Sequence, residues 1–285
     1  MSLAESQLTT PVQTIDAPNG VTYAYRRYGN EAADAAPLVL LQHYRGSLDN
    51  WDPALVDALA ATREVILVAN AGVGRSTGTT PRDVTTMAYD ALAFIDALGL
   101  AEIDLLGFSL GGFVAQELAL IRPQQVRRLV LAGSAPQGGI GIHPIADAPR
   151  AVMTAAQPTA EGLIYLFFEQ SETSTAAGQA FVQRIFTRQE DRDADVTAAT
   201  YEAQMDAIAQ WGAPDPTRLA RLAAIRQPVL AANGVNDIII PTPNTHLLAT
   251  YIPNAELEIY PDAGHGFLFQ YHEQFAARVV RFLDA

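Results

Sequence analysis

The most informative stretch of this sequence is Gly107-Phe108-Ser109-Leu110-Gly111-Gly112, in which glycines flank a serine on both sides. The apolar run 103–107 leads into it, and residues 112–121 behind it have the pattern of an amphipathic helix. A Gly-x-Ser-x-Gly turn between a strand and a helix is typical of a nucleophile elbow, which holds a serine hydroxyl above a sheet. A glycine-rich turn with an incidental serine is the alternative, but the setting favours Ser109 as a nucleophile.

Outward from this turn, short apolar runs alternate with helical patterns. Strands are expected at residues 37–41, 64–69, 103–107, 128–132, 228–232 and 257–260, after an N-terminal hairpin formed by 12–15 and 21–28. Helices are expected near residues 53–61, 85–98, 112–121, 242–250 and 272–283. Strands that are apolar on both faces and alternate with helices predict an α/β fold, in which a mostly parallel sheet carries helices on both faces.

One interval, residues 135–227, breaks this alternation because it contains no convincing strand. It is rich in Ala, Gln, Asp and Glu, and we predict a helical cap inserted into a core of residues 1–134 and 228–285. Its spaced aromatic residues would mostly pack the interior of the cap. Some of them must nevertheless face the sheet. The candidates for a pocket wall are Tyr165, Phe168 and Trp211.

A serine hydroxyl is a weak nucleophile unless a base takes its proton. Among the five histidines, His265 is favoured, because it lies between two glycines just beyond the last expected strand. Loops at the carboxyl ends of parallel strands open on the same edge of the sheet as the nucleophile. Asp237 also follows a strand end and is the candidate that orients the imidazole. Its alternative role is that of a turn or N-cap residue.

In these features the chain resembles the α/β-hydrolase fold family. The matching motifs are Gly107–Gly112, Gly234–Asp237 and Gly264-His265-Gly266, and their order of Ser, Asp and His is the family's order. The resemblance spans nearly the whole chain. It implies an eight-stranded, mostly parallel sheet with a cap insertion, and a catalytic triad of Ser109, His265 and Asp237.

The resemblance also gives a role to the polar cluster Gln42-His43-Tyr44-Arg45-Gly46, which ends an apolar run. In this family the corresponding loop contributes a backbone N–H to an oxyanion hole, and the match implies that Tyr44 and Leu110 are the two donors. His43 stands where the family usually has glycine, so an unusual backbone angle is expected at that position.

Arg45 is expected to overhang the pocket. It could pair with a carboxylate on the substrate, but a structural role, in which Asp49 or Asp52 holds the guanidinium, is favoured. Besides the aromatic residues of the cap, the residues expected to contact substrate are His43, Arg45 and Phe108.

The composition limits the partners of the protein. A formal net charge of -13 at pH 7 disfavours nucleic acid and anionic membrane surfaces, which leaves a small-molecule substrate. The absence of cysteine excludes disulfides, thiolate metal sites and a cysteine nucleophile. The run 72–78 is not a dinucleotide fingerprint, because its third glycine falls one position late, and the triad chemistry requires no metal or organic cofactor. Without a signal-peptide or membrane-span pattern, a cytoplasmic protein is expected, either a monomer or a homodimer.

Together these features predict a serine hydrolase that cleaves a small to medium-sized, largely apolar ester, thioester or lactone through an acyl-enzyme. Cofactor-free haloperoxidases, which act as perhydrolases, and carbon–carbon bond hydrolases use the same triad, and fold does not fix chemistry. A small-molecule receptor with an idle triad is the alternative from another class. Peroxide-dependent bromination, or tight binding without turnover, would distinguish these alternatives from an esterase.

Overall fold

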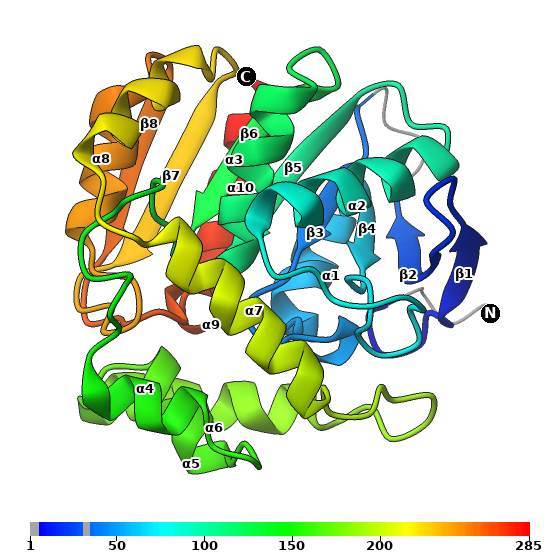
Figure 1. The fold of residues 1–285 in the computed structure, drawn as a ribbon. Helices are drawn as coiled ribbons and strands as arrows, with labels where there is room; N and C mark the ends of the chain where they lie inside the picture. Colours follow the sequence, from blue (N-terminus) through cyan, green and yellow to red (C-terminus); the bar gives the residue numbers. More distant parts are fainter. Residues whose placement is uncertain (1–5, 31–34) are drawn as a thin grey trace.

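The computed structural model describes residues 6–30 and 35–285, and an eight-stranded sheet runs through its centre (Figure 1). The strand order is β1-β2-β4-β3-β5-β6-β7-β8. The pairs β1–β2 and β2–β4 are antiparallel, and every pair from β4 to β8 is parallel. The strands are β1 (Gln13–Asp16), β2 (Thr22–Gly29), β3 (Leu38–Leu41), β4 (Glu64–Val68), β5 (Ile103–Phe108), β6 (Val126–Ala132), β7 (Val229–Gly234) and β8 (Ala255–Tyr260).

Helices cover both faces of the sheet, which explains why its central strands are buried and mainly apolar. Every residue of β3 and of β5 is buried. Helices α2 (Val84–Ala97) and α3 (Leu110–Ile121) pack together on one face, and α1 (Pro53–Ala60) and α10 (His272–Asp284) pack together on the other (Figure 1). The remaining core elements are α8 (Pro243–Tyr251), the short helix α9 (Phe267–Gln270) and the 3-10 turn η1 (Leu48–Asn50). This architecture confirms the predicted fold class.

The interval between β6 and β7 is helical, as predicted, and we call residues 135–227 the cap segment. Figure 1 shows α4, α5 and α6 gathered beyond one end of the sheet, with α7 running back across the core. The division into two domains at these boundaries stays a prediction. The elements of the segment are α4 (Asp147–Met153), α5 (Ala160–Phe167), α6 (Glu172–Ile185), α7 (Ala198–Trp211) and the 3-10 helix η2 (Pro216–Ala224).

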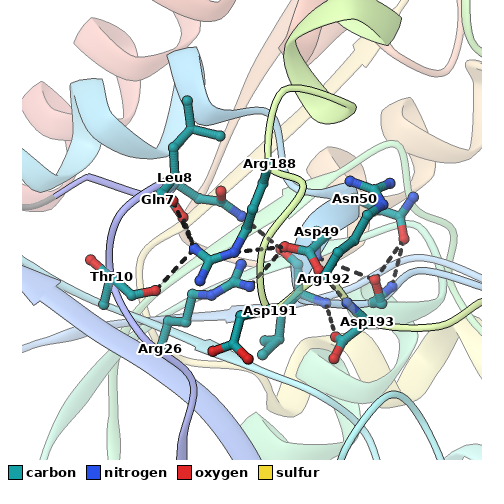
Figure 2. A network of polar contacts seen from close by, with 12 residues as sticks. Gln7, Leu8, Thr10, Arg26, Asp49, Asn50, Arg188, Asp191, Arg192 and Asp193 are labelled. Atoms are coloured by element: carbon teal, nitrogen blue, oxygen red, sulfur yellow. Dashed lines mark hydrogen bonds and ion pairs between the residues drawn. The ribbon is translucent and has the colours of Figure 1, made fainter.

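A buried ion network attaches the cap segment to the core (Figure 2). The carboxylate of Asp49 accepts a hydrogen bond from Arg26 at 2.7 Å and another from the backbone N–H of Asp193 at 2.7 Å. Arg188 donates to the carbonyl oxygens of Gln7, Leu8 and Thr10 at 3.0–3.1 Å. Burial and the neighbouring charge of Asp49 raise the pKa of Asp193. Separating such a network would leave charges buried without partners, so it fixes this part of the cap segment on the core.

The helices of the described residues are short, as the bounds given above show. Within residues 6–30 and 35–285, no helix combines the length and the apolar character that a membrane crossing requires.

Candidate active site

Ser109 lies at the turn between β5 and α3 in a backbone conformation that few residues adopt. Its φ is 57° and its ψ is -120°, which costs a non-glycine residue on the order of 1–3 kcal/mol. The turn can form only because the residues two positions before and after Ser109 are glycines. A Cβ on Gly107 would lie 2.4 Å from the carbonyl oxygen of Gly111, and a Cβ on Gly111 would lie 2.1 Å from that of Leu41. The predicted elbow is therefore present, and α3 begins directly beneath the serine.

His265 and Asp237, which lie 28 residues apart, meet at the carboxyl ends of β7 and β8. The imidazole Nδ1–H of His265 donates to Oδ2 of Asp237 at 2.6 Å, and both side chains are buried. The other carboxylate oxygen accepts the backbone N–H groups of Ile239 at 2.8 Å and Ile240 at 2.9 Å. Asp237 is thus fixed by three hydrogen bonds, and it holds His265 in the tautomer whose Nε2 is free to accept a proton.

Ser109 and His265 both line one cavity of about 600 Å³ between the sheet edge and the cap segment. This volume falls within the range of small-molecule sites. The described residues contain no cluster of three or more His, Asp or Glu side chains that could bind a metal ion. The other lining residues include Tyr44, Asn50, Val152, Met153, Leu163, Leu166, Phe167, Phe186, Arg192, Asp193 and Ile239. The structure therefore places Ser109 and His265 at one cavity, with Asp237 hydrogen-bonded behind His265.

The loop after β3 lies beside the elbow, where the oxyanion donors were expected. Tyr44, Ser109 and Leu110 together line a second, smaller space of about 20 Å³. In the described part of the chain, neither the backbone N–H of Tyr44 nor that of Leu110 donates to a protein acceptor. Two donors next to Ser109 are thus left without partners, as an oxyanion hole requires.

His43 adds a second imidazole to the cavity wall. Its Nδ1–H donates to the carbonyl oxygen of Tyr44 at 2.7 Å, so the neutral ring carries its lone pair on Nε2. No hydrogen bond of Nε2 is found among the described residues, and the His43 side chain lines the cavity. Burial lowers the pKa of His43 to about 3, and the nearby His265 adds to this effect. His43 is therefore a neutral hydrogen-bond acceptor at any ordinary pH.

The unusual backbone angle expected at His43 occurs two residues later. His43 has no positive φ, and Arg45 has a φ of 61°. The predicted partners of Arg45 were also wrong, because Asp49 pairs with Arg26 and Asp52 with Arg184. The guanidinium of Arg45 instead donates to backbone carbonyl oxygens of residues 153, 155 and 156 in the cap segment. A structural role is retained, but with neutral partners.

The phenylalanine, tyrosine and tryptophan residues expected at the substrate do not line the cavity. Phe108 is fully buried beneath both imidazoles, with ring centroids 5.3 Å from His43 and 4.9 Å from His265. Phe168 packs against another cap phenylalanine, and Trp211 stacks on Phe113 of α3 at 5.3 Å. Tyr165, Phe168 and Trp211 are absent from the cavity lining, whereas His43 and Arg45 belong to it.

The phase of helix α5 explains this difference. Its cavity-lining residues are Ala160, Gly162, Leu163, Leu166 and Phe167, which are related by steps of three and four positions and so gather on one side of the helix. Tyr165 lies off that face, and Phe168 follows the last helical residue. The missed residues could have been found from the apolar 3.6-residue period of the segment, whereas aromatic character alone selected the wrong positions.

The chain belongs to the α/β-hydrolase fold family, whose model matches residues 36–270. A solved structure described as an alpha/beta hydrolase fold protein from Chitinophaga pinensis is 40% identical, with a TM-score of 0.91 over 99% of this chain and 100% of that one. A curated relative, the putative carbamate hydrolase RutD of Caulobacter sp. (strain K31), is 28% identical over 90% of this chain and 94% of its own length. The enol-lactonase of Burkholderia xenovorans LB400 shares the fold, with 21% identity and a TM-score of 0.74 over 96% of this chain and 100% of that one.

Proposed function

We propose that this protein is a serine hydrolase that cleaves a small to medium-sized, largely apolar ester, thioester or lactone. Ser109 is the nucleophile, His265 the general base and acid, and Asp237 the group that orients the imidazole. The backbone N–H groups of Tyr44 and Leu110 form the oxyanion hole.

The chemistry proceeds in two acyl-transfer steps. Ser109 Oγ attacks the carbonyl carbon while Nε2 of His265 takes its proton, and Asp237 stabilises the imidazolium that forms. The oxyanion of the tetrahedral intermediate accepts the N–H groups of Tyr44 and Leu110, each worth about 3 kcal/mol in the transition state. The imidazolium protonates the leaving alkoxide or thiolate. Water then attacks the acyl-enzyme with His265 again as base, and the acid is released.

One observation carries this proposal. The serine in the strained elbow and the histidine backed by a buried carboxylate open into the same cavity of about 600 Å³. The apolar side chains of α5 on its wall, together with its limited volume, support a compact and mainly apolar substrate.

The test is a panel of short-chain p-nitrophenyl esters, thioesters and lactones, combined with fluorophosphonate labelling mapped by mass spectrometry. Ser109→Ala should lower kcat by on the order of 10⁶-fold and abolish labelling. Ser174→Ala is the matched control, because it removes a buried cap hydroxyl that lies outside the cavity, and it should keep both activity and labelling. A wild-type protein that neither turns over the panel nor is labelled at Ser109 would refute the hydrolase proposal.

A carbamate is the second candidate substrate, and a specific observation favours it. His43 lines the cavity, and with its Nδ1–H donated to Tyr44 its Nε2 carries a lone pair that can accept a hydrogen bond; a carbamate carries the N–H donor for this acceptor, whereas a simple ester does not. The curated relative from Caulobacter is named as a putative carbamate hydrolase. Comparing kcat/KM for an aryl carbamate with that for the matched aryl carbonate separates the candidates, since only the carbamate gains from this contact.

A further inference from the structure

The loop that carries the proposed oxyanion donor is held by contacts on both sides of a single peptide group. The carbonyl oxygen of Tyr44 accepts the Nδ1–H of His43 at 2.7 Å. The N–H of the same peptide group, which belongs to Arg45, donates to Oε1 of Gln204 at 2.8 Å. Gln204 is fully buried on α7 of the cap segment. Within the loop, the N–H of Gly46 also donates to the carbonyl oxygen of His43 at 3.0 Å, so the cap segment supplies one of several contacts that fix this loop.

Arg45 is itself in a conformation that needs support. Its φ of 61° lies in the left-handed region, which residues other than glycine rarely adopt. In addition to the bond from its backbone N–H, its side chain reaches away from the sheet into the cap segment. The left-handed conformation of Arg45 next to Tyr44 is thus supported by contacts from the cap segment.

The side-chain contacts of Arg45 are numerous and uncharged. The guanidinium donates to the carbonyl oxygens of Met153 at 3.2 Å, Ala155 at 2.7 Å and Ala156 at 3.4 Å, at and just beyond the end of α4. It also lies 4.4 Å from the ring centroid of Tyr201 on α7. Through one residue, the loop after β3 is connected to both α4 and α7.

We propose that Arg45 is a positioning residue through which the cap segment sets the orientation of the oxyanion donor Tyr44. The inference rests on the proposed function, because it requires the Tyr44 N–H to bind an oxyanion. With the cap segment seated, Gln204 and the α4 carbonyl groups hold Arg45 left-handed and keep the adjoining peptide group fixed. With the cap segment displaced, Arg45 loses these partners, and the Tyr44 N–H is no longer held toward Ser109. Full catalytic competence then requires a closed chamber.

The experiment measures the rate of fluorophosphonate labelling of Ser109, together with kcat and KM on the best ester. Arg45→Gly removes the guanidinium while allowing a positive φ, and Gln204→Leu removes only the acceptor on α7. We expect Arg45→Gly to lower both the labelling rate and kcat by about 10- to 100-fold, with KM changed by less than about threefold. Gln204→Leu should shift the same quantities in the same direction by a smaller factor.

Arg82→Gly is the matched control. Arg82 also joins the core to α7, through an exposed ion pair with Asp206, but it does not line the cavity or touch the loop after β3. Its loss should leave labelling within about twofold of wild type. A purely structural Arg45 would lower the melting temperature without changing the labelling rate of the folded protein.

The outcomes separate this inference from the function on which it rests. Absence of labelling in the wild type overturns the proposed function. Labelling of the wild type that is matched by both folded variants, Arg45→Gly and Gln204→Leu, overturns the positioning role alone. If Arg45→Gly does not fold, Gln204→Leu still decides the question, since it leaves the Arg45 side chain in place.

Discussion

Two loops of this molecule, residues 42–47 after β3 and residues 261–266 after β8, each bring a buried histidine to the same cavity. The rings of His43 and His265 both pack against Phe108 and Phe167. They differ in the group behind Nδ1, which is a carboxylate for His265 and a backbone carbonyl for His43. A carboxylate stabilises an imidazolium, whereas a carbonyl dipole does not offset burial, and the pKa of His43 is lowered to about 3. Position in the cavity alone therefore does not make a histidine a base.

Among changes to this comparison, the largest expected effect comes from removing the charge that distinguishes His265 from His43. Asp237→Asn removes the charge behind His265 and keeps an oxygen for the N–H groups of Ile239 and Ile240, so the fold is retained. The amide favours the wrong imidazole tautomer, and kcat on the best ester should fall by about 10⁴-fold. Steady-state kinetics with a melting curve as control measure this. A loss below tenfold would mean that the carboxylate does not distinguish the two histidines.

The second effect concerns stability in acid. A histidine in the unfolded chain has a pKa of about 6.5, so it becomes protonated as the pH falls below that value. Folded His43 stays neutral down to about 3, so the unfolded state binds more protons across this window. The contribution of His43 to the free energy of unfolding should therefore fall by about 1.4 kcal/mol for each pH unit below 6, a tenfold change in the unfolding equilibrium. Urea denaturation of wild type and His43→Phe between pH 7 and pH 4 measures the difference in slope. Parallel curves would show that His43 is protonated normally.

The smallest effect tests what the neutral histidine contributes to recognition. His43→Phe keeps a flat ring against Phe108 but removes the acceptor nitrogen from a residue that lines the cavity. The preference for an aryl carbamate over the matched carbonate should drop by about 10-fold, as expected when one hydrogen bond is lost. The ratio of the two kcat/KM values is the informative measurement, because any disturbance of Tyr44 affects both substrates equally. An unchanged ratio would remove His43 from substrate recognition.

The sheet and the proximity of the triad candidates could be predicted from the sequence, because each depends on a pattern of neighbouring residues. The elbow depends on glycines at fixed offsets from Ser109, and a Cβ at Gly107 or Gly111 would overlap backbone atoms. His265 and Asp237 each follow a short apolar run, so the parallel sheet brings them to one edge. The roles of these residues and of the oxyanion donors are proposals that the kinetic experiments test, and the domain boundaries stay a prediction.

The partners of Arg45 were not predictable in the same way. Asp49 and Asp52 are near it in sequence, but they pair with Arg26 and with Arg184, which is 132 positions from Asp52. Backbone carbonyl groups accept the Arg45 guanidinium, and every residue type carries such a group, so no sequence pattern marks them. The cavity wall was partly missed for a related reason, since the phase of a short helix decides which side chains point inward.

The buried ion pairs between the cap segment and the core have a consequence for redesign of the chamber. Among the described residues, Arg184, Arg188 and the Asp193 contact to Asp49 lie at or after the end of α6, and α4 and α5 contribute no buried ion pair to the core. Arg45 contacts α4 and the residues after it only through main-chain oxygens. Substitutions at positions such as Val152, Leu163 and Leu166 therefore leave no buried charge without its partner. A combinatorial library confined to these positions would vary the width of the chamber while leaving its attachment intact.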